Sequence, residues 1–133
     1  MPKHKQVARK IELRAKPRPL TFKSIRAANI SRCRRWHGTR GLKDWSVMEW
    51  ACAMAGEAGE ACNIAKKIRR VETQIARRKA EYKLPLNAML AEELADTFIY
   101  LDLLAARQGI DLAAGIRAKF NKVSEEFGFP ERL

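Results

Sequence analysis

The chain has 133 residues, of which 47% are hydrophobic, and a formal net charge of +12. This length suits one small domain, and no apolar run approaches the ~20 residues of a membrane span. The N-terminus lacks the apolar centre of a secretory signal, so we expect a soluble, cytoplasmic protein. Cys33, Cys52 and Cys62 form no CxxC pair and lie in apolar sequence, which predicts reduced structural thiols rather than a disulfide framework.

Basic residues are concentrated in the N-terminal third. Residues 1–43 contain fourteen Lys and Arg against one acid, which gives +13, whereas residues 44–133 sum to −1. A basic tail of this kind usually stays solvated and binds polyanions weakly through counterion release. We expect residues 1–20 to form a flexible extension, with weak nucleic-acid binding as its alternative role, and residues 21–133 to form the folded domain.

The first two predicted helices follow this extension. Thr21 is a suitable cap for a helix that runs to Trp36, where the sequence "HGTRG" breaks it. A second helix is expected to start at Asp44 or Ser46 and to run to about Arg70.

Two more helices complete the predicted fold. Residues 71–85 are charged and form either a helix continuation or a loop, closed by Pro85. A strongly apolar helix runs from Asn87 to Gly109, and Asp111 caps a last helix. No alternating strand of useful length is present, so we predict an all-α protein, a four- to five-helix bundle.

Two of these helices contain acids but no bases. Residues 44–65 and residues 84–106 each hold four acids and no Lys or Arg, whereas ordinary solvated helices mix both charges. Each segment has two acids at i, i+3, which lie about 60° apart on one helix face. Unpaired carboxylates in apolar surroundings are costly, and four hard oxygen donors from facing helices suit Mg²⁺, or Mn²⁺. The predicted metal ligands are Glu57, Glu60, Glu93 and Asp96.

The alternative is that each E-x-x-E motif belongs to an ordinary surface helix, and the presence of a second pair argues against it. Glu92 and Asp102 lie out of phase with the pair on their helix, and we expect both to face solvent or another subunit. Tyr100 is in phase, and either hydrogen-bonds a ligand or a carboxylate or packs in the core. Lys67 shares the face of Glu60 and is either a triphosphate contact or a solvated lysine.

The sequence "GEAGE", followed by "EELADTFIYLDLLAARQGIDL" and "KFN", resembles the MazG-like all-α NTP pyrophosphatases, a group that includes the dCTP and dimeric dUTP pyrophosphatases. The resemblance covers Thr21 to Leu133. It implies a Mg²⁺-dependent hydrolase that cuts the α–β phosphoanhydride of a nucleoside triphosphate and releases the monophosphate and pyrophosphate. It also implies a homodimer, or a tetramer built from dimers, in which a partner subunit completes the active site.

The resemblance implies roles for single residues as well. The four acids would hold the metal, and Glu57 or Glu60 would also orient or deprotonate the attacking water. Side chains that would contact substrate are a nucleotide-contacting tyrosine, a phosphate-binding lysine, a nearby polar residue at one of two positions, and an aromatic-His segment near the base. At these positions the chain has Tyr100, Lys119, Asn121 or Ser124, and Trp36 with His37.

Two rival hypotheses remain beside the hydrolase. The first is a non-enzymatic, nucleic-acid-binding helical protein, which the +13 segment favours. The second is a helical scaffold that has kept the fold without the activity, and the presence of all four acids argues against it. The chain has no G-x-x-x-x-G-K-[ST] loop, so phosphates would be held by metal and by side-chain cations.

Overall fold

The structure is a computed structural model that describes residues 19–73 and 84–133. Within these ranges the chain is helical and has no strand, which confirms the predicted all-α class. The helices are α1 (Phe22–His37), the 3-10 helix η1 (Gly38–Lys43), α2 (Val47–Glu72), α3 (Leu86–Arg107) and α4 (Leu112–Glu126). The predicted extension lies outside the described residues except for its last two positions, and so does most of the charged segment before Pro85.

The starts of α1, α2 and α4 are set by side chains that accept hydrogen bonds from free backbone N–H groups. Thr21 caps α1 and accepts from the Ser24 N–H at 3.1 Å. Ser46, rather than Asp44, caps α2, and the Glu49 carboxylate accepts from the Ser46 N–H at 2.7 Å. Asp111 caps α4, as expected. Such caps typically contribute about 1 kcal/mol each, so local sequence fixes these three helix starts.

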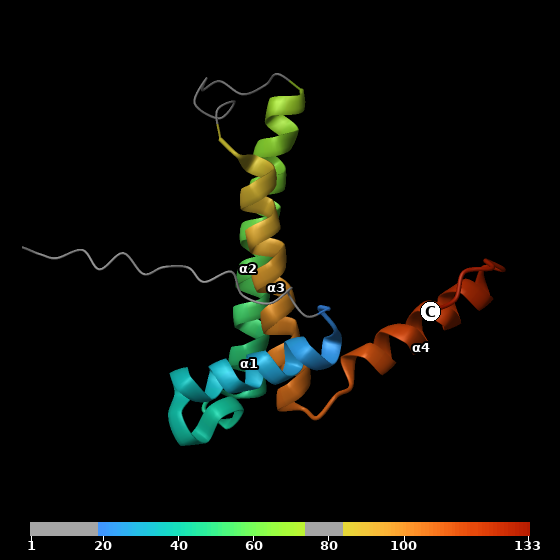
Figure 1. Ribbon diagram of the computed structural model, residues 1–133. Coiled ribbons are helices and arrows are strands. Elements are labelled where there is room, and N and C mark those ends of the chain that lie inside the picture. Colours follow the sequence, from blue (N-terminus) through green and yellow to red (C-terminus); the bar gives the residue numbers. More distant parts are fainter. Residues whose placement is uncertain (1–18, 74–83) are drawn as a thin grey trace, which may run out of the picture.

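The long helices α2 and α3 run antiparallel and pack along one another, while α1 crosses one end of the pair (Figure 1). The core lies at this crossing. Cys33, Trp50 and Leu103 are buried there, one from each of the three helices, and the Trp50 indole donates to the Leu42 carbonyl at 3.0 Å. Partly buried side chains surround them: Leu42, Trp45, Ile99, Tyr100 and Leu104.

The predicted break after α1 is confirmed as a tight turn. Gly38 has φ 62° and Gly41 has φ 49°, a region that favours glycine. Gly41 is also buried, and a Cβ added there would lie 3.3 Å from the Cγ of Arg34. The positive φ of these glycines and the close approach at Gly41 reverse the chain direction after α1, so that α2 starts beside the core.

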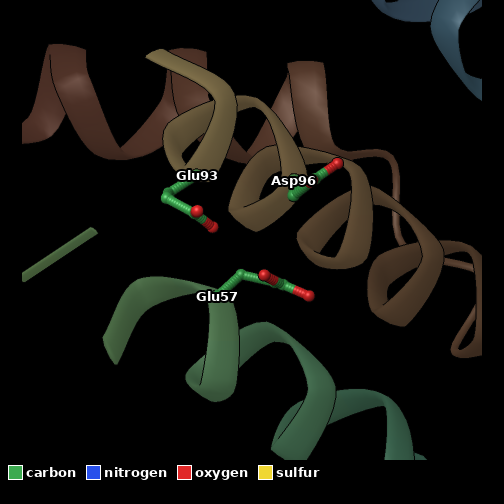
Figure 2. A group of neighbouring side chains, drawn as sticks. All are labelled: Glu57, Glu93 and Asp96. Atoms are coloured by element: carbon green, nitrogen blue, oxygen red, sulfur yellow. The ribbon is translucent and has the colours of Figure 1, made fainter. Parts of the chain in front are cut away.

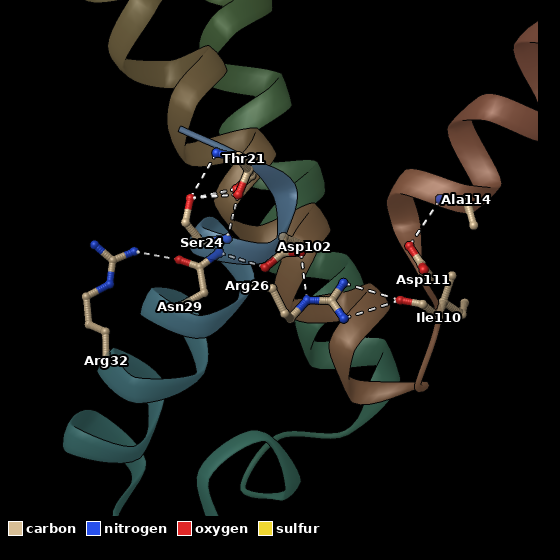
Figure 3. A network of polar contacts seen from close by, with 9 residues as sticks. All are labelled: Thr21, Ser24, Arg26, Asn29, Arg32, Asp102, Ile110, Asp111 and Ala114. Carbon is tan, nitrogen blue, oxygen red and sulfur yellow. Dashed lines mark hydrogen bonds and ion pairs between the residues drawn. The ribbon is translucent and has the colours of Figure 1, made fainter. Parts of the chain in front are cut away.

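Asp102 corrects one expectation. It is 2% exposed, so the prediction that it faces solvent or another subunit is wrong. Its carboxylate accepts from Arg26 Nε at 2.8 Å and from Asn29 Nδ2 at 2.9 Å, both on α1 (Figure 3). Arg26 also donates to the Ile110 carbonyl at 3.3 Å. Asp102 lies on the face of α3 opposite Glu93 and Asp96. Helix α1 covers that face, and its Arg26 supplies the counter-charge.

The three cysteines are free, as predicted, but they differ in environment. Cys33 is buried, and burial together with the charge of Asp44 raises the pKa of its thiol. Cys52 and Cys62 are exposed on α2, so their apolar sequence neighbours do not place them in the core. Among the described residues, no helix has both the length and the apolar character needed to cross a membrane.

Helix α4 stands apart from the other helices. It leaves the end of α3 after Gly109, which has φ 68°, and projects away from the α2–α3 pair (Figure 1). Several of its large apolar side chains are exposed, among them Ile116, Phe120 and, at its end, Phe127. Within residues 19–73 and 84–133, the other helices therefore do not enclose α4 in a bundle.

Candidate metal centre

Three carboxylates lie close together where α2 and α3 pack against each other. Glu57 comes from α2, and Glu93 and Asp96 come from α3 (Figure 2). One oxygen atom from each side chain lies within 4.8 Å of the others. Glu57 and Glu93 are partly buried, whereas Asp96 is exposed, so the group opens to solvent on one side.

Helix periodicity and antiparallel packing produce this arrangement. Positions 93 and 96 lie on one face of α3, and the face of α2 that packs against it presents Glu57. Gly56 and Gly59 flank Glu57, and each weakens the helix by up to ~1 kcal/mol. A Cβ added at either glycine would meet no atom within 4 Å, so nothing in the described chain occupies the space beside them.

Glu60, the fourth predicted ligand, is not part of the group. It is exposed, one turn after Glu57 on α2. Its charge nevertheless acts on the cluster. Partial desolvation raises the pKa of Glu93, and the nearby carboxylates raise it further in the order Glu57, Glu60, Asp96 and Glu92.

No cation balances this charge within the described residues. Among residues 19–73 and 84–133, no hydrogen bond or ion pair reaches the carboxylates of Glu57, Glu93 or Asp96, and Thr97 donates to the backbone carbonyl of Glu93. Three neighbouring carboxylates, of which Glu93 has a raised pKa, form a donor set of hard oxygen atoms. This chemistry fits Mg²⁺ or Mn²⁺, which are bound by a few carboxylates together with water or phosphate oxygens.

Aromatic side chains follow the acids toward the α1 end of the pair. Tyr100 lies one turn beyond Asp96, and its ring centroid is 6.2 Å from that of Trp50. His37 packs edge-on against Trp45 and Trp50, with centroids 5.1 and 5.5 Å away. Its Nδ1 lies 2.8 Å from Asp44 Oδ2, and this hydrogen bond is the main reason that the pKa of Asp44 is lowered.

Three of the predicted substrate contacts meet around one cavity. Trp36, His37 and Tyr100 all line it, but its volume is only about 20 Å³. That space holds about one water molecule and no nucleobase. Trp36 itself is 70% exposed, whereas His37 and Tyr100 are partly buried.

The remaining predicted contacts lie elsewhere. Lys67 is partly buried on α2, about two turns after Glu60. Lys119 is exposed on α4, and Asn121 hydrogen-bonds the end of the chain, accepting from the Leu133 N–H at 2.9 Å. Ser124, the alternative to Asn121, is buried. Because α4 projects away from α2 and α3, the single chain does not bring Lys119 or Asn121 to the carboxylates.

Sequence reasoning missed two polar groups near this end of the molecule. One is Asp102 with its α1 partners, and the other is the pairing of His37 with Asp44. Burial of Asp102 could have been predicted from the sequence, because it is an acid in an apolar helix without bases and lies on the face opposite the acidic pair. The partner could not be identified because it lies 76 positions away along the chain.

The chain matches no protein-family model, no curated protein and no solved structure.

Proposed function

We propose that the protein is a Mg²⁺-dependent nucleoside triphosphate pyrophosphohydrolase of the MazG-like, all-α type. The observation that carries this proposal is the convergence of Glu57, Glu93 and Asp96, with no counter-charge among the described residues. A chain of net charge +12 brings three of its fifteen acids within 4.8 Å of one another, which is expected where a divalent cation binds. The all-helical structure is compatible with this type of enzyme.

The proposed roles follow from position. Glu57, Glu93 and Asp96 would hold Mg²⁺, which when bound neutralises phosphate charge and favours ionisation of water. Glu60 is solvent-exposed, one turn from Glu57, and would orient the attacking water and accept its proton. The water oxygen would bond to the α-phosphorus as the bond to the α–β bridging oxygen breaks. That oxygen would leave with pyrophosphate, and the nucleoside monophosphate would be the second product.

Phosphate and base contacts complete the proposal. Lys67 lies on the helix that carries Glu57 and Glu60 and is the nearest proposed phosphate contact within the subunit. Tyr100, Trp36 and His37 line one cavity beyond Asp96, and base binding there requires that the exposed Trp36 moves aside. Lys119 and Asn121 require that α4 meets the carboxylates of another subunit.

An assembly of identical subunits is part of the same proposal. One side of α4 carries an apolar stripe with helical spacing: Leu112, Ile116, Phe120, Val123 and Phe127. Arg117 and Lys122 lie on other faces of α4 and Lys119 lies at the edge of the stripe, whereas most of α2 and α3 lacks bases. A second copy offers this basic helix an acidic surface with exposed apolar side chains, such as Leu94. We infer a homodimer, or a tetramer of such dimers, in which α4 packs on the partner's α2–α3 pair.

The direct test is hydrolysis of each canonical NTP and dNTP by the purified protein with Mg²⁺, with monophosphate and diphosphate products resolved. We expect monophosphate and pyrophosphate from at least one nucleotide. Glu57→Gln and Asp96→Asn should each lower the rate about 100-fold or more, because each removes a metal ligand. Glu92→Gln is the matched control: it removes one charge from an exposed position of α3 outside the group and should retain activity.

Two outcomes would contradict the proposal. Diphosphate and orthophosphate as products would exclude cleavage at the α–β bond. No turnover of any nucleotide with Mg²⁺ or Mn²⁺ would favour the scaffold or the nucleic-acid-binding alternative.

A further inference from the structure

A basic surface covers the outer side of α1 and the turn that follows it. Residues 19–43 contain seven Lys and Arg and no acid. Arg26 is held by Asp102, and Arg40 pairs with Asp44. The other five are exposed, and within the described residues no ion pair joins them to an acid. We name as the α1 basic face these five residues: Lys23, Arg32, Arg34, Arg35 and Lys43.

An exposed aromatic side chain lies at the edge of this face. Trp36 is 70% exposed, and the guanidinium carbon of Arg32 lies 5.2 Å from the centroid of its ring. Large aromatic side chains are usually buried, and the other two tryptophans of the chain pack around the core. An indole beside an arginine on a basic surface is the combination with which proteins stack unpaired bases and neutralise phosphates.

The rest of the surface favours a nucleic acid over a lipid bilayer. Ala27, Ala28 and Ser31 are exposed between the bases, and their short side chains allow a phosphate backbone to approach the helix. A helix that lies in a membrane surface needs a continuous bulky apolar face, and these positions provide none. Three of the five cations are arginines, whose planar guanidinium groups bind phosphate oxygens in pairs.

The α1 basic face is also separate from the carboxylates. Its cations lie on α1 and η1, whereas Glu57, Glu93 and Asp96 lie on α2 and α3. A polyanion is repelled by the acidic surface around these carboxylates and attracted by the cations of α1 and η1. Trp36 is also a proposed base contact of the hydrolase, but the cations of α1 and η1 are not, and binding of a strand there does not depend on the proposed hydrolase activity.

We propose that the α1 basic face binds single-stranded nucleic acid, with phosphates on its Lys and Arg side chains and one unpaired base stacked on Trp36. Five cations on a single strand predict a slope of about −3.5 for the logarithm of the binding constant against the logarithm of salt concentration. Affinity should then fall about 100-fold between 50 and 200 mM salt. Further cations in residues 1–18 would steepen this dependence.

The experiment measures fluorescence anisotropy of a labelled 20-nucleotide oligo(dT) or oligo(U) with the full chain, at several salt concentrations. Arg34→Gln with Arg35→Gln should weaken binding and reduce the slope by about 1.4. The charge-matched control is Lys66→Gln with Arg69→Gln, two exposed bases on α2, and it should bind like the unmodified chain. Glu57→Gln should also bind normally, whatever its effect on hydrolysis.

Stacking on Trp36 is tested separately. Trp36→Ala should weaken binding of the single strand about 10-fold and leave binding of the duplex of the same length unchanged, because a duplex offers no free base face. Trp36→Phe should retain most of the affinity. Circular dichroism of every variant, compared with that of the unmodified chain, verifies that the helices are intact.

Three results would overturn the proposal. The first is an equal loss of affinity in the Lys66→Gln, Arg69→Gln control, which would mean diffuse attraction to the whole chain. The second is an unchanged affinity of Trp36→Ala for the single strand. The third is binding to phosphatidylserine-containing vesicles without binding to either oligonucleotide, which would make the face a lipid-binding surface.

Discussion

Glu93 lies among four other carboxylates, and its ionisation is coupled to all of them. Desolvation and the charges of its neighbours raise its pKa, and no cation in the described chain opposes them. In the folded state without metal, its negative charge is therefore unfavourable. A divalent cation would reverse this effect, so protonation of Glu93 and binding of a metal compete for the same group.

The Glu93→Gln variant tests this coupling. Because the folded pKa lies above the unfolded value, ionisation of Glu93 disfavours folding, and stability is lost as pH rises through the folded pKa. In EDTA, the melting temperature of the variant minus that of the unmodified chain should therefore be larger at pH 7.5 than at pH 5. Added Mg²⁺ should raise the melting temperature of the unmodified chain more than that of the variant. An identical difference between the two proteins at both pH values would contradict the shift.

At the scale of elements, hydrogen bonds between the buried Asp102 of α3 and two side chains of α1 hold α1 across α3. Asp102 accepts two hydrogen bonds from α1 and is 2% exposed, and Arg26 extends the contact to the start of α4 through the Ile110 carbonyl. Every buried side-chain polar atom in the described residues has a hydrogen-bond partner. The group therefore sets where α1 crosses α3 and also anchors the turn into α4.

Asp102→Ala should destabilise the protein by about 2–4 kcal/mol, measured by urea unfolding. The substitution leaves Arg26 and Asn29 without their acceptor in a largely buried position. Asp102→Asn should cost less, because it keeps one acceptor while it removes the charge. Glu92→Gln, an exposed change on the same helix, serves as the control and should stay within about 0.5 kcal/mol. If Asp102→Ala falls in that same range, the network does not hold α1 in place.

At the scale of the whole molecule, the chain separates three kinds of surface. The outer side of α1 is basic, the α2–α3 pair carries the clustered carboxylates, and α4 presents an apolar stripe that the described part of the chain leaves exposed. Ile116, Phe120 and Phe127 are 37%, 41% and 70% exposed. Exposed apolar side chains that follow one helix face are expected at a subunit interface.

Ile116→Ser with Phe120→Ser should convert the proposed dimer to a monomer in analytical ultracentrifugation. The unmodified chain should sediment with a mass of at least twice 15.2 kDa at micromolar concentration. Ala118→Ser, on another face of α4, is the control and should leave the assembly intact. A monomeric unmodified chain would exclude the proposed assembly, and with it the roles of Lys119 and Asn121 in another subunit's site.

The sequence left Asp44 or Ser46 as the cap of α2 and predicted a group of four carboxylates, of which three come together. By itself it determined the helical class, the caps at Thr21 and Asp111 and the turn after α1. These features depend on residues within a turn or two of each other, where propensity and periodicity act directly. Tertiary structure decided the rest. It left Glu60 outside the carboxylate group, buried Asp102 beneath α1 and kept α4 away from the other helices. Each of these outcomes depends on which helix covers a given face, and contacts between distant segments set that choice.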